Sequence, residues 1–192
     1  MLYVAAFEPE LTKLREFRPS LWAEAVGIGL AAAAVGTCRA LSGRSPRGVV
    51  LVGTCGALPG RGLAIGDLVV ADGVRLASAA VARGEGAMPP PMGDVLSCEG
   101  SLLRLPARSV QVATTLSVTT SDDLAVLMAR STPCDVEHLE AYAVALACRE
   151  AGVPFLAVLA VANEVGARGR EQWSANHVRV SAALADAVNR VL

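Results

Sequence analysis

The chain has 192 residues, of which 53% are hydrophobic and 18% are charged, and its formal net charge is −1. A chain of this length is most simply one domain with a sizeable core. No basic run is present, which argues against a nucleic-acid partner. Gly, Arg or Pro interrupts the longest apolar stretches before membrane-spanning length, so no membrane partner is expected either.

The N-terminus has neither the charged region nor the long apolar core of a signal peptide. The five cysteines are odd in number and form no CxxC pair, and the two histidines lie far apart in the sequence. We therefore expect free thiols in a cytoplasmic protein without a structural metal.

Apolar runs alternate with helical patterns in the first half of the chain. The expected strands are 2–7, 22–26, 48–52 and 67–71, and the expected helices are 11–17 and 30–41. Gly27 and Gly29 precede the second helix, where a glycine turn can present backbone N–H groups to an anion or a hydroxyl. The segment 53–56 is interpreted as a turn. Its small residues favour close approach of another group to the backbone, with an ordinary tight turn as the alternative.

The second half continues the alternation. Residues 77–100, rich in Gly, Pro and Ala, are predicted to form a surface loop or flap. A strand at 110–115 leads to a hydroxyl-rich patch, and Ser121 or Asp122 is expected to cap a helix that continues to Arg130. The stretch 174–192 is predicted to be an amphipathic helix. Its expected apolar side comprises Val178, Val180, Ala183, Leu184, Ala187, Val188 and Val191.

The stretch from 135 to 166 is the most informative. Glu137 and Glu140 are expected to open a helix that ends at Gly152. An apolar run at 155–162 then predicts a strand buried on both faces, which ends in the polar residues Asn163 and Glu164. The alternation throughout predicts the α/β class: a single domain over 1–192, three-layer α/β/α, with a central mixed, largely parallel sheet.

Most of the remaining polar residues follow predicted strands. They are Glu8, Glu10, Thr54, Thr119 to Asp123, Glu137, Glu140, Asn163 and Glu164. If the strand ends converge, these residues form a pocket, because ligands bind at such ends in open α/β sheets. Carboxylates beside hydroxyl-binding groups suit a sugar substrate and an oxocarbenium-like transition state. One carboxylate can bind ribose hydroxyls while another activates water.

Each candidate also has a structural interpretation. Glu8, Glu137 and Glu164 are more simply explained as solvated surface acids, and Cys55 as a small buried filler. A Ser-His-acid triad is not expected, because neither histidine lies at a strand end near an exposed serine. A Walker-type phosphate loop is absent, and the turn at Gly53 lacks the full dinucleotide fingerprint.

Most of the chain resembles the nucleoside phosphorylase/nucleosidase superfamily. The segments that carry the resemblance are VAAFEPEL, VGIGLAAAA, VVLVGTCGALPGRGLAIGDLVVAD and VEHLEAYAVALACREAGVPFLAVLAVAN. The resemblance implies that Glu10 is the base that activates water and that Asn163 binds the purine near N7 and its 6-position. It implies substrate-binding positions at Thr54, Cys55, Gly56, Thr120, Leu139 and Glu140, with Glu140 on the ribose hydroxyls.

Within the superfamily the chain is most similar to futalosine hydrolase, which removes hypoxanthine from futalosine in an alternative menaquinone pathway. The GVPF turn and the segment NEVGARGREQW carry this similarity. The resemblance implies a purine nucleoside as the small-molecule partner, no cofactor or metal, and a homodimer. An amide cannot protonate N7 of adenine but can hydrogen-bond a 6-oxopurine, so Asn163 favours hypoxanthine- or guanine-type bases.

Two alternatives remain open at this point. One is a phosphorylase on the same fold, although Glu10 and the absence of a Gly-x-Pro-x-Arg segment favour hydrolysis. The other is a catalytically weak nucleoside-binding protein. It is motivated by Leu159 and Gly169, where the family often has other residues, and by the lack of an aromatic residue between Thr119 and Asp123.

Overall fold

The computed structural model describes residues 1–192. The strands are β1 (Leu2–Ala5), β2 (Ala23–Ala25), β3 (Val49–Ala57), β4 (Leu68–Leu76), β5 (Leu96–Ser97), β6 (Arg108–Thr114), β7 (Val136–His138) and β8 (Phe155–Glu164). The α-helices are α1 (Pro9–Phe17), α2 (Leu30–Leu41), α3 (Ala79–Ala82), α4 (Asp122–Ser131), α5 (Ala141–Glu150) and α6 (Gly169–Val191), and a 3-10 turn covers Gly100–Leu102. None of these helices is both long enough and apolar enough to cross a membrane.

The sheet is mixed and closes on itself. Strand β3 pairs with β8, β8 with β4, β4 with β6, β6 with β7, and β7 returns to β3. Strands β2 and β1 extend the sheet beyond β3, and β5 extends it beyond β4. The α/β class and the mixed sheet are confirmed, but five of the strands close into a barrel, so the structure is not clearly the three-layer α/β/α arrangement that was expected. The pairings of β3 with β8 and of β4 with β6 each contain a register shift, with the extra residue at Ala162 of β8 and at Asp72 of β4, and such bulges bend strands enough to close a barrel.

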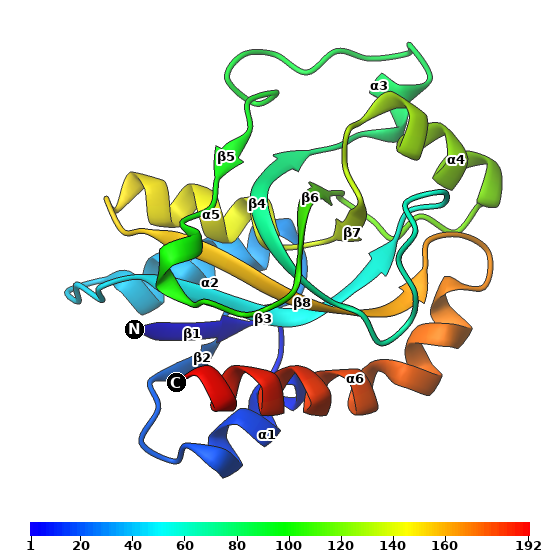
Figure 1. Cartoon of the computed structure of the whole chain (residues 1–192). Helices are drawn as coiled ribbons and strands as arrows, with labels where there is room; N and C mark the ends of the chain where they lie inside the picture. Colours follow the sequence, from blue (N-terminus) through cyan, green and yellow to red (C-terminus); the bar gives the residue numbers. More distant parts are fainter.

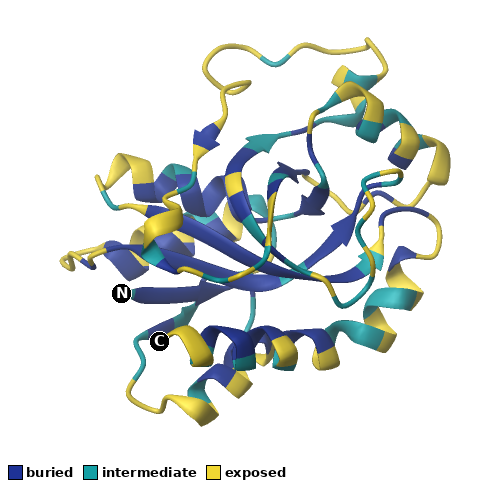
Figure 2. Ribbon diagram, in the orientation of Figure 1, coloured by how far each residue is buried: buried dark blue, intermediate teal, exposed yellow.

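Helices cover the extended part of the sheet from two sides. Helix α6 packs on β8 and against α1, and α2 packs against α5 on the other side (Figure 1). Strand β8 is buried along its apolar length, as Figure 2 shows. Its residues alternate between two core clusters: Phe155 and Leu159 face α2 and α5, and Leu156 and Val158 face α1 and α6.

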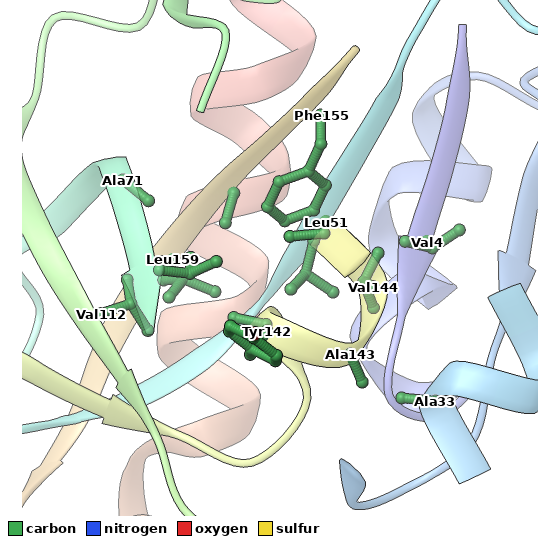
Figure 3. Close-up of a cluster of buried hydrophobic side chains, with 14 of the residues drawn as sticks. Val4, Ala33, Leu51, Ala71, Val112, Tyr142, Ala143, Val144, Phe155 and Leu159 are labelled. Atoms are coloured by element: carbon green, nitrogen blue, oxygen red, sulfur yellow. The ribbon is translucent and has the colours of Figure 1, made fainter. Parts of the chain in front are cut away.

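Figure 3 shows the first of these clusters, in which Leu159 and Phe155 meet Tyr142 and Val144 of α5. Each fully buried Val or Leu side chain contributes about 1.5–3 kcal/mol through removal of apolar surface from water. The prediction of a strand buried on both faces at 155–162 is therefore confirmed.

Several element boundaries differ from the predictions. Residues 53–56 are part of β3 rather than a turn, with the register shift between Cys55 and Gly56. Glu137 lies in the short strand β7, not in a helix, and α5 begins only after Glu140. The Ser121 cap and the helix over 30–41 are confirmed.

The predictions for the C-terminal helix and for the loop over 77–100 also differ from the structure. Helix α6 begins at Gly169 rather than Ser174, and Val178, Ala183 and Val191 are exposed. Its buried residues are Gly169, Val180, Ser181, Leu184, Ala185, Ala187 and Val188. The loop contains two short elements, α3 and β5, and is otherwise irregular.

Candidate active site

A cavity of about 410 Å³ lies where several strands and helix starts meet. It is lined from the segment after β1, the ends of β3, β7 and β8, and the first turns of α1 and α6. The cavity brings together all eight residues to which the family resemblance assigns a site role: Glu10, Thr54, Cys55, Gly56, Thr120, Leu139, Glu140 and Asn163. Their roles remain predictions, but all of these residues line the same cavity.

Glu10 is a buried acid in the first turn of α1. Its Oε1 accepts hydrogen bonds from the Thr54 backbone N–H at 2.9 Å and from Thr54 Oγ1 at 3.0 Å. Its Oε2 has no partner. Burial raises the pKa of Glu10 to about 7, although the bonds from Thr54 oppose the rise and nearby Glu140 adds to it. A carboxyl with this pKa suits general-base chemistry near neutral pH.

Gly53 explains why small residues are required at the end of β3. A Cβ on Gly53 would lie 3.2 Å from both carboxyl oxygens of Glu10, and a Cβ on Gly56 would lie 2.9 Å from Asn163 Nδ2. The groups that approach the backbone closely are thus the candidate catalytic side chains themselves. The close approach expected from the sequence is confirmed, although the segment is a strand.

Trp173 supports Glu10 through Thr54. The Trp173 Nε1–H donates to Thr54 Oγ1 at 3.1 Å, so the Thr54 hydroxyl proton is left to donate to Glu10. The Trp173 ring stacks on His177, with centroids 4.0 Å apart, and lies 6.3 Å from Phe7. Phe7 lines the cavity but was not identified from the sequence. In the sequence, Trp173 was noted only as part of the segment NEVGARGREQW, which carries the family resemblance.

Glu140 is the second buried acid, at the N-terminus of α5. The Gly29 backbone N–H donates to its Oε1 at 2.7 Å. Gly29 has φ +85°, a conformation that favours glycine. The glycine turn before α2 therefore does present an N–H group to an anion, as expected, but that anion is the side chain of Glu140.

His138, the last residue of β7, is buried beside Glu140. Its Nδ1 accepts from the backbone N–H groups of Glu140 at 3.0 Å and Ala141 at 3.2 Å. Burial lowers the pKa of His138, against the opposing charge of Glu140, so the ring is neutral at pH 7. The 3.0 Å approach of Nδ1 to Glu140 Oε2 is consequently not an ion pair.

His138 does lie at a strand end, at the last residue of β7, and a strand as short as β7 shows no alternation from which this could be predicted. No serine hydroxyl bonds to either histidine, however, so no Ser-His pair is formed.

Glu137 is a third buried acid and was wrongly expected to be solvated. Its Oε1 accepts from the Thr119 N–H at 3.1 Å, and its Oε2 accepts from Thr119 Oγ1 at 2.6 Å. Burial raises its pKa, and the bonds from Thr119 oppose the rise. Glu137 thereby ties the segment between β6 and α4, which carries the cavity residue Thr120, to the sheet. Glu8 and Glu164 are exposed, as expected.

Asn163 closes the cavity at the end of β8. One Nδ2–H donates to the Glu164 backbone carbonyl at 2.8 Å, which leaves Oδ1 and the second Nδ2–H for a ligand. Cys55 is buried, which raises the pKa of its thiol and disfavours the nucleophilic thiolate. No group of three or more His, Cys, Asp or Glu side chains is arranged to hold a metal ion.

Comparisons with known proteins identify the family and the fold of the chain. The model of the Phosphorylase superfamily matches residues 21–192. No curated protein sequence matches the chain significantly. Among solved structures, the chain is similar to 5'-methylthioadenosine/S-adenosylhomocysteine nucleosidase from Helicobacter pylori, at 15% identity and a TM-score of 0.85, over 98% of this chain and 95% of that one.

Two further structures have the same fold. Futalosine hydrolase of H. pylori strain 26695 is 14% identical with a TM-score of 0.84, over 98% of this chain and 95% of that chain. The methylthioadenosine/adenosylhomocysteine nucleosidase of Neisseria meningitidis, in complex with methylthio-immucillin-A, is 20% identical with a TM-score of 0.83, over 99% and 96%. The family model covers most of the chain, and these folds agree with it. The chain therefore belongs to the phosphorylase superfamily.

Proposed function

We propose that the chain is an N-ribosyl hydrolase that cleaves the N-glycosidic bond of a purine nucleoside and releases a 6-oxopurine, such as hypoxanthine from futalosine. The observation that carries the proposal is the buried carboxyl of Glu10, whose pKa lies at about 7 and whose Oε2 has no partner, in one cavity with Glu140. The proposal treats the chain as one domain and requires no cofactor.

Glu140 and Glu10 would divide the chemistry between them. Glu140, held by the Gly29 N–H, would bind the ribose hydroxyls and fix the sugar. A water bonded to Glu10 Oε2 would attack C1′ as the bond from C1′ to the purine breaks. The water proton would pass to Glu10, and the bonding electron pair would leave with the base. The positive charge that develops on the sugar is favoured by the surrounding carboxylates.

Asn163 supports a 6-oxopurine as the leaving group. Its second Nδ2–H can donate a hydrogen bond to N7 of the nucleoside, but an amide has no acidic proton to give to N7 of adenine. Adenine is a poor leaving group without that proton. A 6-oxopurine can instead spread the negative charge onto its oxygen.

The charges around the cavity support hydrolysis over phosphorolysis. Three buried acids, Glu10, Glu137 and Glu140, line it. The Gly29 N–H, which could otherwise bind an anion, is already bonded to Glu140. Carboxylates that are ionised would repel a phosphate dianion, whereas they attract water and a cationic sugar.

A base-release assay tests the proposal. Purified protein would be incubated with futalosine, inosine and methylthioadenosine, each with and without phosphate, and the free base would be measured by chromatography. We expect hypoxanthine from futalosine, with or without phosphate. Release that requires phosphate would assign the chain to the phosphorylases, and release of adenine alone would contradict the preference assigned to Asn163.

We further propose that the chain forms a homodimer. Several apolar side chains are exposed beside or near the cavity lining: Ile28, Val35, Leu116 and Val118. Their burial in an interface would remove apolar surface from water. Light scattering after size exclusion should give twice the chain mass of 19.7 kDa; a monomer at micromolar concentration would contradict this.

A further inference from the structure

One cation lines the cavity, and it has no partner within the chain. Arg170 is the second residue of α6, is exposed and lines the cavity with the three buried acids. It forms no ion pair and no hydrogen bond, whereas Arg168, two residues earlier, pairs with Glu171 at 3.8 Å and lines a different cavity. The guanidinium of Arg170 is therefore free to contact a ligand in the cavity.

The start of α6 places Arg170 at the Asn163 end of the cavity. Gly169 packs directly against Asn163, since a Cβ on Gly169 would lie 3.2 Å from Asn163 Nδ2 and 3.1 Å from the Glu164 carbonyl oxygen. Glu140, the acid assigned to the ribose, is held instead by the turn before α2. Arg170 thus belongs to the part of the cavity assigned to the base, not to the sugar.

Asn163 leaves one requirement of a 6-oxopurine unmet. One Nδ2–H of Asn163 donates to the Glu164 carbonyl, so the side chain has one N–H left to donate to the base. In a 6-oxopurine nucleoside, N7 and the neighbouring oxygen on C6 are both acceptors. A base whose N7 accepts from Asn163 therefore needs a second donor, beside Asn163, for O6.

We propose that Arg170 supplies this donor and selects the leaving group, an inference that rests on the proposed function. Its guanidinium would donate to O6 of a 6-oxopurine while the second Nδ2–H of Asn163 donates to N7. As the bond from C1′ to the base breaks, the electron pair moves into the purine and onto O6, where a fixed cation stabilises it. Every other charged side chain that lines the cavity is a carboxylate and would oppose that charge.

A 6-aminopurine has the opposite requirement. Its amino group is a donor, so it would place N–H groups against a guanidinium that can only donate. Arg170 and Asn163 together would therefore discriminate against adenine nucleosides through an unpaired donor and an uncompensated charge, not through cavity size.

The test compares Arg170→Ala, Arg170→Lys and the control Arg168→Ala on futalosine and on its 6-amino analogue. A hydrogen bond to a charged group is worth about 1.5–3 kcal/mol, which converts to a loss of roughly 10- to 150-fold. We expect kcat/KM for futalosine to fall by this factor in Arg170→Ala, mostly through kcat. Arg170→Lys should recover part of the loss, and Arg168→Ala should stay within about twofold of wild type.

Equilibrium binding of the free bases separates this inference from the hydrolase proposal. Calorimetry with hypoxanthine and adenine should show a preference for hypoxanthine that Arg170→Ala abolishes, whether or not the protein hydrolyses any nucleoside. A preference that survives in Arg170→Ala, or wild-type protein that binds neither base, would overturn the assignment of Arg170. Failure of wild-type protein to release base, with the preference intact, would overturn only the hydrolase proposal.

Discussion

Replacing Glu10 with glutamine should stabilise the protein above neutral pH. Burial raises the pKa of Glu10 from its ordinary value of 4.5 to about 7, so the folded protein binds this proton more tightly than the unfolded chain. Ionisation then costs no stability below about pH 4.5, costs progressively more as the pH rises, and reaches its full penalty above about pH 7. At 1.36 kcal/mol per pKa unit, the full penalty is about 3 kcal/mol.

Glutamine removes the charge without losing the local bonds. Its side-chain oxygen can still accept from the Thr54 N–H and hydroxyl, as Glu10 Oε1 does. The amide NH₂ takes the position of Oε2, which has no partner in the chain.

Urea denaturation of wild type, Glu10→Gln and Glu8→Gln at pH 5 and pH 8 measures the effect. Glu8 is exposed and pairs with Arg15 at the surface, so Glu8→Gln is a matched control expected to change stability by less than about 1 kcal/mol. We expect Glu10→Gln to raise the free energy of unfolding by up to about 3 kcal/mol at pH 8 and by less than about 1 kcal/mol at pH 5. An equal change at both pH values, or destabilisation at pH 8, would refute the burial argument.

Three further predictions follow from the same geometry. Base release should fall about tenfold per pH unit below pH 7, because Glu10 must be ionised to accept a proton; a flat kcat/KM profile from pH 5 to 8 would contradict this. Trp173→Phe removes the bond to Thr54, worth about 0.5–1.5 kcal/mol, and should lower kcat roughly two- to tenfold without loss of the folded far-ultraviolet circular dichroism spectrum. Gly36→Ala would put a Cβ 1.8 Å from the Val26 carbonyl oxygen and should cost about 1–3 kcal/mol in thermal unfolding, whereas an unchanged Tm would mean that α2 shifts freely.

The sequence predicted most of the elements that position the cavity. Strand β8 was readable because each of its faces meets a different core cluster, which produces an unbroken apolar run. Glu10, Thr54 and Asn163 could be selected as neighbours because each follows or ends a strand of the same sheet. Their exact partners depended on contacts between segments distant in the sequence, such as Thr54 and Trp173.

What could not be predicted has physical causes as well. Barrel closure depends on the register shifts in the β3–β8 and β4–β6 pairings, and a shift cannot be predicted from hydrophobic alternation. Strand β7 has three residues, too few to show any period, so Glu137 was predicted to be a solvated acid at the start of a helix. Glu137 is buried because Thr119, from another segment, donates hydrogen bonds to both of its carboxyl oxygens.

The most direct test of the account is hypoxanthine release from futalosine in phosphate-free buffer at pH 8, by wild type, Glu10→Gln and Glu8→Gln. The account predicts release by wild type and Glu8→Gln, and loss of at least about a hundredfold in Glu10→Gln, since general-base catalysis contributes typically 10²–10⁴-fold. Release by Glu10→Gln at the wild-type rate would contradict the assignment of Glu10 as the base that activates water.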